Sequence, residues 1–583
     1  MFKFDSKRLI IPFLVGALTL VACDKADDSA GGSSMRISDD SILQYVPADS
    51  PYVFASVEPL PDDILDKLEP KFDRILKSYE GLLREAMAIA SSKVAEGQGD
   101  AGDFETASAV VAELSSLMSI EGLRGAGIGR ESTAVFYGHG LLPVLRMHVS
   151  DGALFDAALA RIETKAGEKM PVATIGNSSF RYFEIADVKV IVAVLGDQVV
   201  ITVAPLSYDD RQLSTLLGLT LPDSSIVDSG ALKSIADEYG YISYFVGYVD
   251  FARIVDTFIS DATGLDADLI ALMEHDSSEL SDVCRSEIRS LAGIAPRMVM
   301  GYTDITAERL TSQLVIEMRD DIASGLATLT SAVPGLGGDQ GGLMSFGMSI
   351  NVKALRTFVE TRLDALEADP FECEMFANLQ QSVASGRMAL NQPLPPMAYD
   401  FKGFVGVVNN IEGLDMVNRT PPTSIDARFL LAMNNATALV SLGAMMSPEL
   451  MGLNIEPNGE PVRFELASMD AMMDNVFLAL TNDALAMSIG EGVEAQLADM
   501  LAADAEENGT FLSFSMDAGR YYAFIGAAMA AADQDDDSPM PPEIQAAMQD
   551  VMLAVADIYD RMSAAIRFTE KGIVMDSSVR FQD

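Results

Sequence analysis

One local pattern constrains the fold more than any other feature of the chain: a strand-like segment that runs directly into an amphipathic helix. The four such segments begin at Tyr52, Tyr244, Leu343 and Phe511. Where strand and helix meet, a short polar side chain can accept hydrogen bonds from the free N–H groups of the first helical turn. The residues predicted to cap a helix in this way are Asp250, Asn351 and Asp517. Strands and helices that follow one another without strict alternation predict an α+β fold with largely antiparallel sheets.

The order of these segments occurs twice. In each half, a strand–helix segment is followed by a hairpin, a group of strands, a second strand–helix segment and a second hairpin. The hairpins are expected near residues 133, 297, 401 and 564, and the groups of strands at 180–204 and 462–489. Equivalent segments lie roughly 265–290 residues apart. We therefore predict two tandem-duplicated domains, each a sheet with packed amphipathic helices.

The two repeats and the segments around them give five predicted regions. They are a signal peptide at 1–22, a tether at 23–41, a first α+β repeat at 42–333, a glycine-rich linker at 334–342 and a second α+β repeat at 343–583. Long helical segments are expected at 62–118 and 542–562. Hydrophobic residues make up 49% of the chain, which is enough for two substantial cores.

The charge of the chain excludes two classes of partner. Its formal net charge is −46. Nucleic acid needs a basic face for its phosphates, and an anionic lipid surface would repel the body, so neither is an expected partner. Solubility alone is a sufficient explanation for an acidic balance of this size.

Catalytic and metal-binding signatures are scarce. The chain contains neither HExxH, CxxC, a phosphate-binding G-x-x-x-x-G-K-[ST] loop nor a G-x-S-x-G elbow. His139 and His148 fall in one predicted hairpin, and His275 lies in an acidic loop. Ordinary turn or surface histidines are the more common case, so no catalytic residue, metal site or cofactor is predicted. Clustering of His139, His148 and a carboxylate in one pocket would favour an enzyme.

Two further motifs are interpreted as loops. The segment GAGIGR at 125–130 has its third glycine misplaced for a nucleotide loop, and a strand follows where a helix should begin. Asp533, Asp535, Asp536 and Asp537 form the densest acidic run. This run lacks the spaced ligands and the glycine of a dedicated calcium loop, so a solvated acidic loop is expected.

Methionine is unevenly distributed, since 25 of the 32 methionines lie after residue 295. Examples are Met445, Met446, Met469, Met472 and Met473. Flexible, polarisable side chains could line a groove for a lipid or an apolar peptide, but filling an ordinary core is more common. Copper binding is a weaker third alternative, because no M-x-M series occurs.

The N-terminus explains where the protein is expected to reside. Basic residues within 3–8 precede an apolar run at 9–22, which is too short to span a bilayer comfortably and is typical of a secretory signal. Its last residues, LVAC, resemble the lipobox of bacterial lipoproteins. The resemblance implies that Cys23 is acylated and becomes the first residue of the mature protein. Asp24 is similar to the signal that retains enteric lipoproteins in the inner membrane. An ordinary cleavable signal followed by a chance cysteine is the alternative.

The polar segment after Cys23 has few apolar residues and is expected to be a flexible tether. The remaining cysteines, Cys284 and Cys373, can either pair in an oxidising compartment or stay free. Their pairing would link the two predicted repeats.

The predicted function is non-enzymatic. The segment VPADSPYVFASV from Val46 is similar to the starts of uncharacterised bacterial envelope proteins of duplicated α+β type. We expect a lipid-anchored, periplasm-facing binding or scaffold protein of the cell envelope, with another envelope protein as partner. The first alternative is a carrier of a lipid or other hydrophobic ligand, and the second is an unrecognised hydrolase. A carrier needs a continuous apolar cavity of roughly several hundred cubic ångströms, whereas a scaffold needs an exposed apolar patch.

Overall fold

The computed structural model describes residues 41–95, 101–413, 422–464, 475–505, 507–532 and 541–582. Within them the protein is mixed α+β, with 18 α-helices and one antiparallel sheet of 19 strands. The chain divides into two compact units. The first comprises residues up to Leu280 with Arg297–Ser312 and Met540–Ala554, and the second comprises Ser281–Pro296, Gln313–Pro539 and Val555–Asp583.

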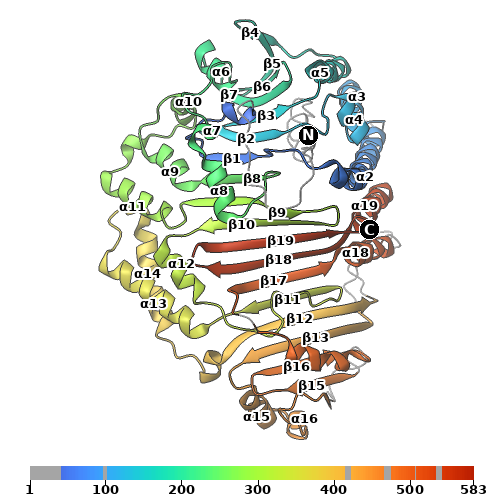
Figure 1. The fold of residues 1–583 in the computed structure, drawn as a ribbon, viewed down its shortest axis with the longest axis vertical. Helices are drawn as coiled ribbons and strands as arrows, with labels where there is room; N and C mark the ends of the chain where they lie inside the picture. The colour runs from blue at the N-terminus through green and yellow to red at the C-terminus, as the bar shows by residue number, and fades with distance from the viewer. Residues whose placement is uncertain are drawn as a thin grey trace. The chain divides into compact units, whose positions relative to one another are not determined.

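The strands of the first unit are paired in the order β4-β5-β6-β7-β3-β2-β1-β8-β9, and β10 follows β9 (Figure 1). They are β1 (Tyr52–Ala55), β2 (Ala134–His139), β3 (Leu142–His148), β4 (Val172–Ile175), β5 (Ser178–Ile185), β6 (Val188–Leu195), β7 (Gln198–Pro205), β8 (Val246–Asp250), β9 (Arg297–Ile305) and β10 (Arg309–Glu317).

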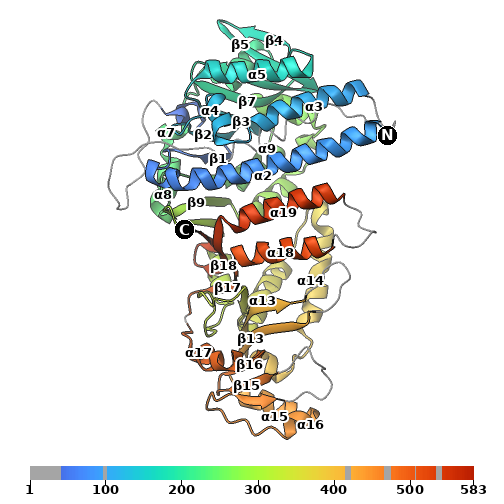
Figure 2. The same ribbon diagram turned by 90° about the vertical axis from the view of Figure 1, so that its right-hand side faces the viewer.

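Helices cover parts of this sheet. They are η1 (Ile42–Tyr45), α2 (Asp62–Ala95), α3 (Ala101–Ser116), α4 (Ile120–Gly125), α5 (Gly152–Ala166), α6 (Asp210–Leu216), α7 (Ile226–Ser229), α8 (Ala231–Tyr239), α9 (Phe251–Ile259), α10 (Leu265–Leu272), η2 (Ser277–Glu279) and α19 (Pro542–Ala556). α3 packs between α2 and α5 (Figure 2). Leu76, Phe155 and Leu159 from these helices form one core cluster with Val192 and Val199 of the sheet.

The strands of the second unit are paired in the order β14-β15-β16-β13-β12-β11-β17-β18-β19. They are β11 (Met344–Ser349), β12 (Phe401–Glu412), β13 (Ser424–Met433), β14 (Val462–Phe464), β15 (Val476–Leu480), β16 (Ala484–Ile489), β17 (Thr510–Asp517), β18 (Tyr559–Thr569) and β19 (Gly572–Phe581). The second half of β10 belongs to this unit, where Gln313 Nε2 donates to Asp576 Oδ1 at 2.9 Å.

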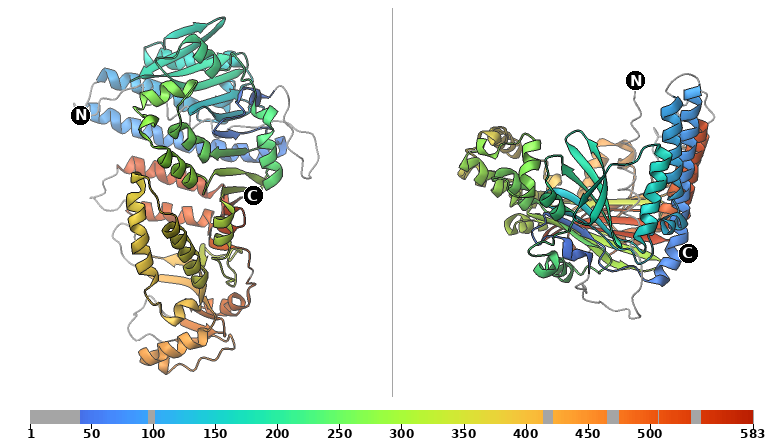
Figure 3. Two further views of the ribbon diagram at one scale, coloured as in Figure 1. Left: turned by 90° about the vertical axis from the view of Figure 1, so that its left-hand side faces the viewer. Right: turned by 90° about the horizontal axis from the view of Figure 1, so that it is seen from above.

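The helices of the second unit are α11 (Asp282–Ala292), α12 (Asp320–Ala327), α13 (Val352–Ala368), η3 (Glu374–Phe376), α14 (Ala377–Leu390), η4 (Pro396–Tyr399), α15 (Ala436–Met446), α16 (Pro448–Met451), η5 (Val493–Gln496), α17 (Leu497–Ala502) and α18 (Ala518–Ala532). α13 and α14, yellow in Figure 3, pack against each other.

The local sequence signals are confirmed at the predicted helix caps. Asp250 accepts from Arg253 N at 2.8 Å, and Asp517 accepts from Arg520 N at 2.9 Å. Asn351 likewise caps α13, because its Oδ1 accepts from the backbone of the first turn. The four predicted hairpins are also present, as β2–β3, β9–β10, β12–β13 and β18–β19.

One predicted helix is too long. The helix expected at 542–562 ends at Ala556, and strand β18 begins at Tyr559. From Arg561 the chain alternates polar and apolar residues, with Met562 and Ile566 on the apolar side, and this period of two favours a strand.

Candidate functional site

Strand β11 buries its small and polar residues and leaves its apolar ones at least partly exposed, which is the reverse of the usual arrangement. Ser345, Gly347 and Ser349 are buried, whereas Phe346 on the opposite face is 38% exposed. The Ser345 hydroxyl is hydrogen-bonded to that of Ser515 at 3.0 Å, and the Ser349 hydroxyl donates to the carbonyl of Thr510 at 2.6 Å. A half-buried antiparallel strand normally turns its apolar side chains inward.

The register carries this outward apolar side across seven strands of the second unit. Side chains directly opposite each other on neighbouring strands share one face of a sheet. Three rows result, which together we call the apolar face. They are Ala427–Val408–Met344–Met516–Met562–Val579, Met487–Phe429–Gly406–Phe346–Phe514–Ala564–Ser577 and Leu485–Leu431–Phe404–Met348–Leu512–Ile566–Met575.

The apolar face is open to solvent from β11 to β19. Four of its residues are among the exposed large hydrophobic side chains: Phe346 at 38%, Leu512 at 37%, Phe514 at 43% and Met575 at 41%. At its outer edge, by contrast, Leu431 and Leu485 pack with residues of α15. No member of the three rows carries a charge, so the face is a contiguous apolar patch of the kind that marks an interaction site.

Strands β1 and β2 of the first unit carry a smaller aromatic patch. Phe136 of β2 is 38% exposed, and its ring lies 6.4 Å from that of Phe54 and 5.6 Å from that of Tyr52. Phe54 and Phe136 are directly opposite in the ladder. We call Tyr52, Phe54 and Phe136 the aromatic patch.

The carboxylate of Asp266 lies near the hydroxyl end of the Tyr52 side chain, and both contact the backbone of Leu141. Its hydroxyl donates to the carbonyl of Leu141 at 3.1 Å, and the amide of Leu141 donates to Asp266 Oδ1 at 2.7 Å. Burial raises the pKa of Asp266, the hydrogen bond from Leu141 opposes this shift, and the charge of Asp49 adds to it. Burial, with a smaller contribution from Asp266, raises the pKa of Tyr52 to about 12.

The raised pKa of Asp266 gives a prediction about stability. The folded state binds this proton more tightly than the unfolded state, so the contribution of Asp266 to stability is present at low pH and is lost as pH rises through its folded pKa. Asp266→Asn keeps an oxygen acceptor for Leu141 and is expected to raise Tm at pH 7 by roughly 1–2 °C, with a smaller effect near pH 4. Differential scanning calorimetry at both pH values measures this. The exposed Asp187→Asn is the control, and an equal rise for both variants would refute the explanation.

The histidines do not form a catalytic group. His139 is paired with Leu142 beside the hairpin turn, whereas His148 is at the other end of β3 opposite Gln198. His148 Nε2 is 3.5 Å from Asp197 Oδ2. Burial lowers the pKa of His139, against the opposing charge of Asp49. His139 and His148 therefore lie at opposite ends of the β2–β3 hairpin.

The other singled-out residues have structural roles or lie outside the described residues. His275 Nε2 is 2.6 Å from the carbonyl of Phe258. In the GAGIGR segment, α4 ends at Gly125, and Arg130 pairs with acidic side chains of α2. Met445 and Met446 are exposed on α15. The residues outside the described ranges are Cys23, Asp24, Met469, Met472, Met473, Asp533, Asp535, Asp536 and Asp537.

The structure joins Cys284 and Cys373 in a disulfide, with 4.8 Å between the Cα atoms. Glu287 of α11 adds a second connection, because its carboxylate accepts from the backbone N of Glu372 at 2.7 Å and of Cys373 at 3.1 Å. Both cysteines lie in the second unit, although Cys284 precedes the predicted linker in sequence.

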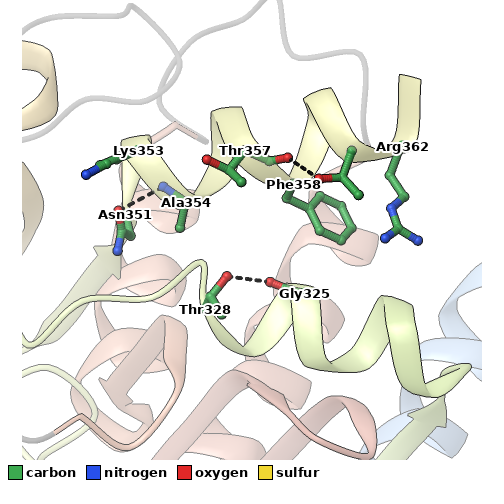
Figure 4. A pocket seen from close by; sticks show the side chains of 9 residues that line it. Gly325, Thr328, Asn351, Lys353, Ala354, Thr357, Phe358 and Arg362 are labelled. Carbon is green, nitrogen blue, oxygen red and sulfur yellow. Dashed lines mark hydrogen bonds between the residues drawn. The ribbon is translucent and has the colours of Figure 1, made fainter. Parts of the chain in front are cut away.

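A groove of about 400 Å³ lies between α12 and α13 (Figure 4). The Phe358 ring points into it, toward Gly325, and Arg362 lies beside that ring and pairs with Asp321. The hydroxyls of Thr328 and Thr361 donate to carbonyls of their own helices. The groove is thus an open space between two helices, and its threonine hydroxyls do not point toward a common ligand position.

Comparison with known proteins gives no match to a family model, a curated protein or a solved structure. Among the described residues, three or more metal-ligating side chains do not come together anywhere. The helices in those same ranges are all too short or too polar to cross a membrane.

Proposed function

We propose that this protein is a non-enzymatic binding or scaffold protein of the bacterial cell envelope, anchored through acylated Cys23 and facing the periplasm. The observation that carries the proposal is the open apolar face of the second unit. Burying serine and glycine while exposing phenylalanine and methionine gives up core packing, and a partner that covers the exposed side would recover the lost stabilisation. Methionine side chains suit such a surface because they adapt to varied apolar partners.

The body is proposed to be a tandem duplication, which accounts for one such surface in each unit. Strand order supports this: β1, flanked by β2 and β8, corresponds to β11, flanked by β12 and β17. Individual backbone hydrogen bonds also match, since Asp250 N donates to the carbonyl of Pro51 at 2.7 Å and Asp517 N donates to the carbonyl of Leu343 at 2.9 Å. In this alignment Phe54 of the aromatic patch corresponds to Phe346 of the apolar face.

Location in the envelope rests on the N-terminal sequence and the cysteines. A tether after Cys23 would hold the body away from the bilayer, and Asp24 favours the inner over the outer membrane. The disulfide between Cys284 and Cys373 suits an oxidising compartment such as the periplasm.

The geometry favours docking over carriage. A carrier encloses its ligand in an apolar cavity, but the apolar face lies open, and the groove beside α13 is lined by threonine, lysine and arginine as well as Phe358. An extended surface of this kind suits an apolar segment of another protein.

Photo-crosslinking in the living bacterium tests this function. Benzoylphenylalanine replaces Phe346 or Phe514, and Tyr399, which is 40% exposed in η4, is the matched control outside the face. We expect polypeptide adducts from the first two positions and none from the control. Adducts of lipid mass would instead establish a carrier, and equal yields at all three positions would contradict the proposal.

The anchor has its own prediction. Cys23→Ala removes the acylated side chain and is expected to move most of the protein from the membrane to the soluble periplasmic fraction, because the remaining chain lacks the acyl groups that hold it. Fractionation followed by immunoblotting measures the shift. A variant that stays in the membrane fraction would exclude the lipid anchor.

A further inference from the structure

The aromatic patch of the first unit adjoins carboxylates that lack basic partners. Asp266 is held at the end of the β2–β3 hairpin by the bond from Leu141 N, and a side chain at Gly140 would collide with its Oδ1, at 2.4 Å. Asp49 is exposed, lies three residues before Tyr52, and interacts electrostatically with Asp266. The two carboxylates and the aromatic rings therefore share one end of the sheet of this unit.

Nearby cations do not neutralise these carboxylates. Arg253 Nε lies 3.6 Å from Asp250 Oδ2, and Arg253 Nη1 donates to the carbonyl of Ser50 at 3.2 Å. Within the described part of the chain, neither Asp49 nor Asp266 forms an ion pair with lysine or arginine. Burial lowers the pKa of His139 and so disfavours its charged form. Two carboxylates without a lysine or arginine ion-pair partner among the described residues thus lie beside the aromatic patch.

We propose that this surface binds a polypeptide segment in which lysine or arginine flanks apolar residues. The apolar side chains would pack on Phe136 and Phe54, and the cation would lie between Asp49 and Asp266. The inference rests on the proposed binding function and names the chemistry of its partner. The net charge of −46 would attract such a segment and speed its association.

Charge also selects among apolar partners. An anionic phospholipid would place its headgroup against these carboxylates and the acidic body and would be repelled. A segment with acidic flanks would be repelled in the same way. A basic, apolar polypeptide is the class that satisfies both the rings and the carboxylates.

Synthetic peptides test the proposal with the mature chain carrying Cys23→Ala, which contains every described residue. Three peptides share an apolar centre of leucine and phenylalanine and differ only in lysine, glutamate or glutamine flanks. Fluorescence anisotropy at low salt is expected to show the lysine peptide binding about tenfold more tightly than the glutamate peptide. The double variant Asp49→Asn/Asp266→Asn is expected to remove most of this preference.

The matched control is Glu184→Gln/Asp187→Asn, which removes the same formal charge from two exposed positions of the β5–β6 hairpin. It should keep the preference, whereas Phe136→Ser should weaken binding of all three peptides. Peptides that bind equally, or a preference that survives the Asp49/Asp266 variant, would overturn the inference and leave the proposed function standing. Absence of binding by every peptide would also overturn it, and crosslinking at Phe346 would then decide the proposed function separately. Tighter binding of anionic lipid vesicles than of the lysine peptide would overturn it in favour of lipid.

Discussion

Replacing Cys284 and Cys373 together by serine is expected to lower the free energy of unfolding of the second unit by roughly 4 kcal/mol. The disulfide closes a loop across a sequence separation of 89 residues, so its loss restores much conformational freedom to the unfolded chain. Urea unfolding of the double variant, compared with oxidised and reduced wild-type protein, measures the difference.

The loss should be localised. The disulfide and two backbone hydrogen bonds to Glu287 connect α11 to residues 372–373. Without the disulfide, only these two hydrogen bonds of that connection remain. We expect faster hydrogen exchange in α11 and near η3, with little change in β12 and β13. A decrease in stability below about 1 kcal/mol would mean that residual structure in the unfolded chain already restrains this loop.

Sequence reasoning predicted the local elements well, because their signals are local. The caps at Asp250, Asn351 and Asp517 need only a polar residue followed by an amphipathic helix, and all three are formed. The order of strands and hairpins was predicted for the same reason. The end of α19 was missed because the alternation of polar and apolar residues that favours a strand begins only at Arg561, after β18 has already started.

The direction of the β11 side chains could not be predicted from alternation. Period two shows that Ser345 and Phe346 face opposite sides but does not say which side is crowded. A side chain at Gly347 would meet Leu336 at 2.7 Å and the carbonyl of Phe404 at 3.0 Å, so the inner side has room only for small residues. That crowding comes from the segment after α12 and from β12, which local pattern does not place.

The burial of Arg146 is likewise determined by residues distant in the sequence. Its position in an alternating strand is compatible with exposure, yet it is fully buried. Its guanidinium donates to Gln198 Oε1 and to the carbonyl of Leu217, both at 2.6 Å, and lies 3.8 Å from the centre of the Tyr45 ring. These partners come from β7, the end of α6 and η1, and only the folded chain brings them together.

The exposed rings should matter for binding much more than for folding. Phe346→Thr/Phe514→Thr replaces each ring with a β-branched residue that also favours strands, so we expect it to change the free energy of unfolding by less than about 1.5 kcal/mol. Binding should weaken by roughly 30-fold, because large aromatic residues near the centre of an interface carry much of its energy. Chemical denaturation and adduct yields from a benzoylphenylalanine at Met575 measure the two effects.

The contrast with a core substitution makes this prediction decisive. Leu430 of β13 lies on the buried face with Val405 and Val407, and Leu430→Ala is expected to cost about 2–5 kcal/mol. If the double threonine variant were destabilised as strongly as Leu430→Ala, the phenylalanines would be core residues and the apolar face would not be a binding surface. If stability were preserved and binding lost, the outward rings of β11 and β17 would be retained for a partner, because folding would not require them.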